Sequence, residues 1–162
     1  MPRQAGVLVL FSLLSVVCAM SIVRPMRYKE VLQRLYERNV MVPAKMGLES
    51  SERLYELIGR PLDGVPTVHV AGTNGKGSVC YKMSQVFQAG GLKTGLFVSP
   101  HISSYRERVV VDDAILTEEE VIVGLQDLIS LCEDAGIPAT VFELNTALAF
   151  CKFKRVDVDA VA

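Results

Sequence analysis

The sequence predicts an α/β fold with a parallel sheet, flanking helices and a phosphate-binding loop. Residues 67–71 form a short β-branched run, a glycine-rich loop follows over residues 72–78, and residues 79–88 have helical periodicity. Two further segments, residues 92–98 and 156–162, have the composition and alternation of strands. Because helix-like segments separate these strands, a parallel sheet is the expected arrangement.

The composition is that of an ordinary globular chain of about one domain. The chain has 162 residues, 50% of them hydrophobic and 22% charged, and 17 Lys+Arg nearly balance 18 Asp+Glu. Since positive charge is not in excess, binding to nucleic acid or to an anionic membrane surface is not expected. The four cysteines lie at spacings that match no zinc or disulfide framework, which indicates a reducing compartment.

Residues 1–25 are interpreted as a targeting or leader segment. Residues 7–23 are almost wholly apolar and lie between Arg3 and Arg24, as in a secretory signal peptide. An organellar presequence is the alternative, and so is a misassigned start. The apolar stretch is shorter than the about 20 residues that a membrane-spanning helix needs, so no stable span is expected.

Two short helices are expected before the glycine loop. Residues 28–38 place apolar side chains on one helical face and charges on the other. A second helix is expected to begin at a cap formed by Ser50 or Ser51. Gly59 and Pro61 are expected to end it. Neither helix carries a pattern that indicates chemistry.

The glycine loop is the strongest functional signal, and it predicts a cradle for a nucleoside triphosphate. Its backbone N–H groups are unobstructed by side chains and lie at the positive end of a helix, and its lysine can reach terminal phosphates. The loop departs from the common G-x-x-x-x-G-K-S/T pattern, because Val70 replaces the first glycine and Gly77 follows Lys76. We expect Lys76 to act in catalysis and Ser78 to be the hydroxyl nearest a magnesium ion; a glycine turn with a surface lysine is the alternative. The loop residues expected to bind the nucleotide are Gly72, Thr73, Asn74, Gly75, Lys76, Gly77 and Ser78.

This loop resembles the phosphate loop of the Mur ligase superfamily, most closely its folate branch, the folylpolyglutamate and dihydrofolate synthases. A second motif agrees, since Ser99-Pro100-His101 and residues 105–109 are similar to the family's SPH…ERI stretch. The resemblance implies that Ser99 is a magnesium ligand and that His101 and Arg106 lie near the folate. From the residues alone, Ser99 also fits a turn, His101 a structural histidine, and residues 106–108 a solvated charged loop.

The segments that follow predict a hairpin and two more helices. Residues 109–113 read as a strand and a turn, and Thr117 and Glu120 form a capping box that opens a helix ended by Gly136 and Pro138.

A third resemblance lies in residues 140–147, which are similar to the family's T-x-F-E…T segment. It implies that Thr140 and Phe142 contact the pteridine end of the folate. The ordinary alternatives are a core phenylalanine and, for Glu143, a first-turn acid that complements the helix dipole.

The resemblance implies that residues 26–162 are the amino-terminal part of a Mur-ligase-like ATP-binding domain, truncated and without the glutamate-binding carboxy-terminal domain. The intact enzyme adds L-glutamate to a folate or dihydropteroate carboxylate through an acyl phosphate, with ATP and Mg²⁺ as cofactors. Small molecules are the expected partners, a monomer is the expected state, and the family implies the cytosol or the mitochondrion. The alternatives are another Mur-type amino-acid ligase and an inactive nucleotide-binding fragment.

Overall fold

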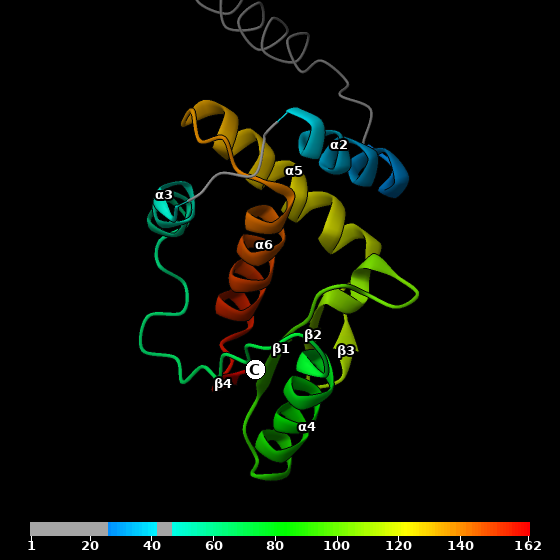
Figure 1. Cartoon of the computed structure of the whole chain (residues 1–162), viewed down its shortest axis with the longest axis vertical. Coiled ribbons are helices and arrows are strands. Elements are labelled where there is room, and N and C mark those ends of the chain that lie inside the picture. Colours follow the sequence, from blue (N-terminus) through cyan, green and yellow to red (C-terminus); the bar gives the residue numbers. More distant parts are fainter. Residues whose placement is uncertain (1–25, 42–46) are drawn as a thin grey trace, which may run out of the picture.

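The computed structural model describes residues 26–41 and 47–162 (Figure 1). The predicted leader segment, residues 1–25, lies outside the described residues. The elements, in chain order, are α2 (Tyr28–Met41), α3 (Glu49–Leu57), α4 (Lys76–Ala89), β1 (Thr94–Phe97), the 3-10 helix η1 (Tyr105–Arg108), β2 (Val109–Val111), β3 (Ala114–Ile115), α5 (Glu118–Asp134), α6 (Val141–Val156) and β4 (Ala160–Val161).

The sheet is mixed, so the prediction of a parallel sheet holds for only part of it. Its four strands have the order β3-β2-β1-β4, in which β1 and β4 are parallel while β1–β2 and β2–β3 are antiparallel. The reason is the connection between β2 and β3, where Asp112 and Asp113 have φ values of 46° and 65°. A two-residue turn of this kind makes the hairpin predicted from residues 109–113. It is far too short for the crossover that parallel neighbours require.

The strand predicted over residues 67–71 is reduced to a single parallel bridge between Thr67 and Val161. The Val68 N–H donates to the Val161 carbonyl at 2.9 Å, and the Val161 N–H donates to the Pro66 carbonyl at 2.9 Å. This segment therefore runs parallel to β4, as β1 does. The chain leaves both the segment and β1 at the same edge of the sheet, which brings the glycine loop and the stretch after β1 together.

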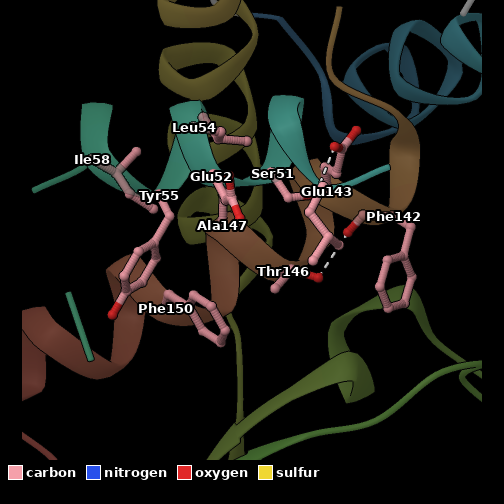
Figure 2. Close-up of a pocket in the computed structure, with 11 residues that line it drawn as sticks. Ser51, Glu52, Leu54, Tyr55, Ile58, Phe142, Glu143, Thr146, Ala147 and Phe150 are labelled. Atoms are coloured by element: carbon pink, nitrogen blue, oxygen red, sulfur yellow. Dashed lines mark hydrogen bonds between the residues drawn. The ribbon is translucent and has the colours of Figure 1, made fainter. Parts of the chain in front are cut away.

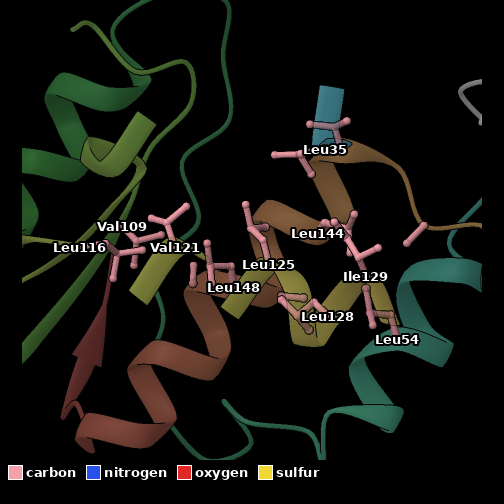
Figure 3. Packing of buried hydrophobic residues seen from close by; sticks show 14 of the residues in the cluster. Leu35, Leu54, Val109, Leu116, Val121, Leu125, Leu128, Ile129, Leu144 and Leu148 are labelled. Atoms are coloured by element: carbon pink, nitrogen blue, oxygen red, sulfur yellow. The ribbon is translucent and has the colours of Figure 1, made fainter. Parts of the chain in front are cut away.

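Helices cover both faces of β1 (Figure 1). Neighbouring residues of a strand point to opposite faces, so their contacts identify the helix on each face. Leu96 packs with Cys80 of α4 in a small cluster. A Cβ on Gly95 would point instead at Phe153 of α6, which is fully buried. The larger core lies among α2, α5 and α6 (Figure 3) and includes Leu35, Val121, Leu125, Leu128, Ile129, Leu144 and Leu148.

The capping box that opens α5 is confirmed. The Glu120 N–H donates to Thr117 Oγ1 at 3.1 Å, and the Thr117 N–H donates to the Glu120 carboxylate at 3.0 Å. The predicted cap of the second helix is wrong, because α3 begins at Glu49 after the N-cap Leu48. Ser51 lies inside that helix, where its hydroxyl donates to Glu143 of α6 at 2.8 Å. Among the described helices, none is long and apolar enough to cross a bilayer.

Candidate nucleotide site

The glycine loop leads directly into α4, whose first residue is Lys76. Gly75 is the N-cap and has φ 76°, and Gly72 has φ 149°. Both values lie where residues with a Cβ are strained, which explains glycine at these two positions. The first backbone N–H groups of α4 point out of the helix end, and such groups bind anions well.

The Lys76 side chain is folded over the loop. Its ammonium donates to the carbonyls of Gly72 at 2.5 Å and Thr73 at 3.1 Å. These contacts place a positive charge at the mouth of the loop, beside the amino end of α4. The arrangement therefore concentrates positive potential where the sequence predicts terminal phosphates.

One cleft of about 770 Å³ is lined by both the loop and the stretch after β1. Five predicted site residues line it: Gly75, Gly77, Ser78, Ser99 and His101. The structure therefore brings residues of the glycine loop and of the Ser99-Pro100-His101 motif to one cleft. The cleft continues along α4 past Tyr81 and Lys82 and is bounded on its other side by the β2–β3 hairpin.

Arg108 connects the polar side chains of the segment after β1. One guanidinium nitrogen donates to Ser99 Oγ at 2.8 Å, and Nε donates to His101 Nδ1 at 3.0 Å. Because Nδ1 accepts this bond, the imidazole in this contact carries its proton on Nε2. His101 thus has a definite tautomer and partner, neither of which can be deduced from the sequence.

Glu107 holds the backbone of the segment after β1 in place through three hydrogen bonds. Its carboxylate accepts hydrogen bonds from the N–H groups of Ile102 at 2.9 Å, Ser103 at 3.2 Å and Ser104 at 2.8 Å. The three bonds hold the pKa of Glu107 below its usual value, and the bond from Ile102 has the largest effect. The interpretation of residues 106–108 as a merely solvated charged loop is therefore wrong.

Arg106 does not line the cleft, although its neighbour Glu107 does. Its Nε is buried and has no hydrogen-bond partner among the described residues. The structure therefore does not bring Arg106 together with Ser99 and His101.

Thr140 and Phe142 lie outside the cleft that the glycine loop and the stretch after β1 line. Thr140 is the N-cap of α6: its Oγ1 accepts the Glu143 N–H at 3.2 Å, and its N–H donates to the Glu143 carboxylate at 2.7 Å. This second capping box has the same T-x-x-E pattern as the first, so the signal was present in the sequence. The Glu143 carboxylate therefore caps α6 and also accepts a hydrogen bond from Ser51 of α3, and Figure 2 shows the bond to Ser51.

Phe142 is not a core residue, since 60% of it is exposed. Its ring lies 6.2 Å from that of Phe97, which ends β1, at a tilted angle of 51°. It also lines an apolar pocket of about 380 Å³ between α3 and α6 (Figure 2). Leu54, Tyr55, Ile58, Ala147 and Phe150 form most of the remaining wall.

The sequence missed two supporting residues, Tyr105 and Asn145. The Tyr105 hydroxyl donates to Asn145 Oδ1 at 2.5 Å, and both residues are buried. Burial raises the pKa of Tyr105, so the phenol keeps its proton and remains a donor. The bond ties η1 to α6, forty positions later, and no local pattern indicates such a contact.

The donor set in the cleft fits a magnesium ion that is held mainly by a nucleotide. The hydroxyls of Ser78 and Ser99 are hard oxygen donors, and Mg²⁺ combines one or two protein groups with waters and phosphates. Within residues 26–41 and 47–162, no group of three or more His, Cys, Asp or Glu residues is placed to hold a metal.

Comparison with known proteins identifies the family. No protein-family model matches the chain. A probable bifunctional folylpolyglutamate synthase/dihydropteroate synthase of Haloferax volcanii is 37% identical over 139 residues, which cover 83% of this chain and 16% of the relative. A dihydrofolate synthase/folylpolyglutamate synthase of Escherichia coli is 33% identical over 132 residues, or 80% of this chain and 29% of the relative. The chain belongs to the folylpolyglutamate synthase/dihydrofolate synthase family.

Solved structures of this family share the fold. The folylpolyglutamate synthase of Thermotoga maritima superposes with a TM-score of 0.74 at 33% identity and covers 83% of this chain, which spans 32% of that protein. The Mycobacterium tuberculosis enzyme complexed with ADP gives 0.71 at 28% identity, over 81% of this chain and 31% of that one. A folylpolyglutamate synthase complex with AMPPCP and folate gives 0.75 at 28% identity, over 84% of this chain and 34% of that one. The resemblance expected from the motifs is thereby confirmed, and the chain spans less than two thirds of every relative compared.

Proposed function

We propose that residues 26–162 form the Mg·ATP-binding part of a ligase that adds L-glutamate to a folate or dihydropteroate carboxylate. The observation that carries the proposal is the shared cleft, which Gly75, Gly77 and Ser78 line from the start of α4 and Ser99 lines from the segment after β1. Lys76 does not line this cleft; its ammonium lies beside it, on the carbonyls of Gly72 and Thr73. The complexes of family members with ADP, and with AMPPCP and folate, support it.

In the proposed reaction, the loop and Lys76 hold the triphosphate. The first N–H groups of α4 already point out of the helix end and contact the phosphate oxygens. The Lys76 ammonium joins them by turning from the carbonyls of Gly72 and Thr73 to the phosphates. A substrate carboxylate oxygen attacks the γ-phosphorus and ADP leaves, which gives an acyl phosphate. The amine of L-glutamate then attacks the acyl carbon and inorganic phosphate leaves.

Ser78 and Ser99 are the residues that would hold Mg²⁺ in this cleft. When bound, the ion neutralises charge on the phosphoryl oxygens. The chain's own contribution is to present two hydroxyls from two different elements, α4 and the segment after β1, to the same space.

For the substrate, we propose that Phe142 contacts the flat heterocycle of the folate. Its ring is largely exposed and lies near Phe97 at the carboxyl end of β1, and an aromatic face suits a planar ring system. Thr140 serves as the helix cap that sets the position of Phe142 two residues later.

The experiment measures binding and ligation separately. Isothermal titration of the purified chain with Mg·ADP should show binding, and Lys76→Ala should weaken it by about tenfold or more, since a hydrogen bond to a charged group contributes about 1.5–3 kcal/mol. Lys154→Ala, at an exposed lysine in the last turn of α6, is the matched control and should bind like the wild type.

Ligation is then assayed with labelled glutamate on dihydropteroate and on tetrahydrofolate, using both this chain and the longest product of its gene. Transfer that depends on Lys76 supports the ligase. If Lys76→Ala binds Mg·ADP as tightly as the wild type, Lys76 does not bind the phosphates. If both proteins bind nucleotide but neither transfers glutamate, a non-catalytic nucleotide-binding role is favoured.

A further inference from the structure

We propose that Arg108 is a positioning residue for the nucleotide cleft, which fixes the Ser99 hydroxyl and the His101 imidazole in one orientation. The proposal rests on the function proposed above, because it assigns Arg108 a role in presenting Ser99 to Mg·nucleotide. Arg108 does not itself line the cleft, so it acts through the two residues that do.

The guanidinium makes two directed hydrogen bonds to the segment after β1. It donates to Ser99 Oγ at 2.8 Å and, through Nε, to His101 Nδ1 at 3.0 Å. Arginine holds its donors in a rigid planar fork, so the two bonds fix the relative position of the serine and the histidine. A lysine ammonium at the same place is a flexible point charge and lacks that geometry.

Arg108 is itself held from two sides. Its guanidinium carbon lies 5.6 Å from the centroid of the Tyr105 ring, and the Tyr105 hydroxyl is bonded to buried Asn145 of α6. Its carbonyl accepts the Val98 N–H at 3.0 Å, which closes the base of the loop. The contacts therefore run without interruption from α6 in the core to the edge of the cleft.

These bonds decide which atoms Ser99 and His101 present. A serine hydroxyl has two acceptor lone pairs and one proton, and the bond from Arg108 occupies one lone pair. The other lone pair remains for a cation, and the proton remains as a donor to an acceptor beside it. At His101, the bond to Nδ1 leaves Nε2–H as a donor. Without Arg108, both side chains would sample several rotamers, and ordering them would reduce the affinity for metal.

The test compares nucleotide affinity with and without Mg²⁺. ADP is titrated into wild type, Arg108→Lys and Arg108→Met, in EDTA and then in excess Mg²⁺. We expect both variants to bind ADP in EDTA as tightly as the wild type, because the loop and Lys76 are unchanged. In excess Mg²⁺, the gain in ADP affinity should be about tenfold smaller in the variants than in the wild type. Arg108→Met retains an aliphatic stem against Tyr105, so it serves as the second variant if one of the two folds poorly.

Arg60→Lys is the matched control. The guanidinium carbon of Arg60 lies 5.6 Å from the centroid of the Tyr55 ring, the same distance as Arg108 from Tyr105, and Arg60 bonds to Asp63 at 2.6 Å. Arg60 does not line the cleft. The Arg60→Lys variant should show the same Mg²⁺-dependent gain in ADP affinity as the wild type. Ser99→Ala should lose the effect, and Ser99→Ala combined with Arg108→Lys should lose no more, because Arg108 acts through Ser99.

Each outcome has a definite meaning. Three outcomes would overturn the positioning role while leaving the proposed function intact. Both Arg108 variants could show the wild-type gain in ADP affinity with Mg²⁺, their losses could add to that of Ser99→Ala, or they could bind ADP more weakly without metal. A wild-type chain whose nucleotide affinity does not respond to Mg²⁺ and does not depend on Lys76 would overturn the proposed function, and the positioning role with it.

Discussion

Gly95 allows α6 to approach the sheet closely, and Gly95→Ala should therefore destabilise the fold. A Cβ at this position would lie 2.8 Å from Phe153 Cδ1 and 2.9 Å from both Cε1 and Cγ. Carbon atoms pack best at about 3.5–4.0 Å, so the ring would have to retreat by about 0.7 Å or more. Phe153 is fully buried, which means that the ring cannot move without displacing other core residues.

The expected loss follows from this geometry. Overpacking a well-packed core costs about 1–3 kcal/mol. Replacing glycine by alanine inside a strand returns roughly 0.5–1 kcal/mol of backbone entropy. The two ranges combine to a loss of about 0–2.5 kcal/mol, and from the middle of that range we expect the free energy of unfolding to fall by about 1 kcal/mol.

Urea unfolding followed by circular dichroism measures the change as a lower midpoint. Combining Gly95→Ala with Phe153→Leu should recover part of the loss, because the smaller side chain removes the clash, and a double-mutant cycle gives the coupling energy. Gly77→Ala is the matched control: among the described residues its Cβ would meet only Val98 Cγ1, at 3.9 Å. Equal stability of Gly95→Ala and wild type, or no coupling to Phe153, would refute the reasoning.

Three further predictions address the loop, the segment after β1 and the caps. Gly77→Ala should fold normally but bind Mg·ADP more weakly, since the added methyl group has room in the protein and would meet the phosphates; unchanged binding in calorimetry would contradict a close approach there. The bonds to Glu107 lower its pKa from the reference value of 4.5, so their stabilisation is complete above the pKa of the unfolded chain and is lost as the pH falls through the lower folded value. The amide proton shift of Ile102 should therefore titrate below the range of an exposed glutamate, and titration at the ordinary value would exclude the anchor. Thr140→Ala and Thr117→Ala should each lower the unfolding free energy by about 1 kcal/mol in urea melts, as lost N-caps do, and a neutral result at Thr140 would show that its cap does not stabilise α6.

Local chemistry explains which features the sequence determined. Both capping boxes, the buried face of α5 and the turn at Asp112 and Asp113 involve residues within one or two helical turns or one hairpin of each other. Their hydrogen bonds and side-chain spacing are decided by neighbours in the chain, so they can be read from the order of residues. The glycine loop belongs to the same class, because a left-handed glycine before a helix is a local requirement.

Contacts between distant segments decided the rest. The antiparallel pairing of β1 with β2, the reduction of residues 67–71 to one bridge and the exposure of Phe142 depend on which segments meet in space. The arrangement around Arg108 depends on Tyr105 reaching Asn145 of α6, which no local pattern specifies. The sequence alone thus determined the glycine loop before α4 and the family of the chain, while only the tertiary structure showed how Ser99 and His101 are held beside that loop. The physical reason is that a helix cap or a turn is completed by its own neighbours, whereas a site of this kind is completed by residues that meet only when the chain folds.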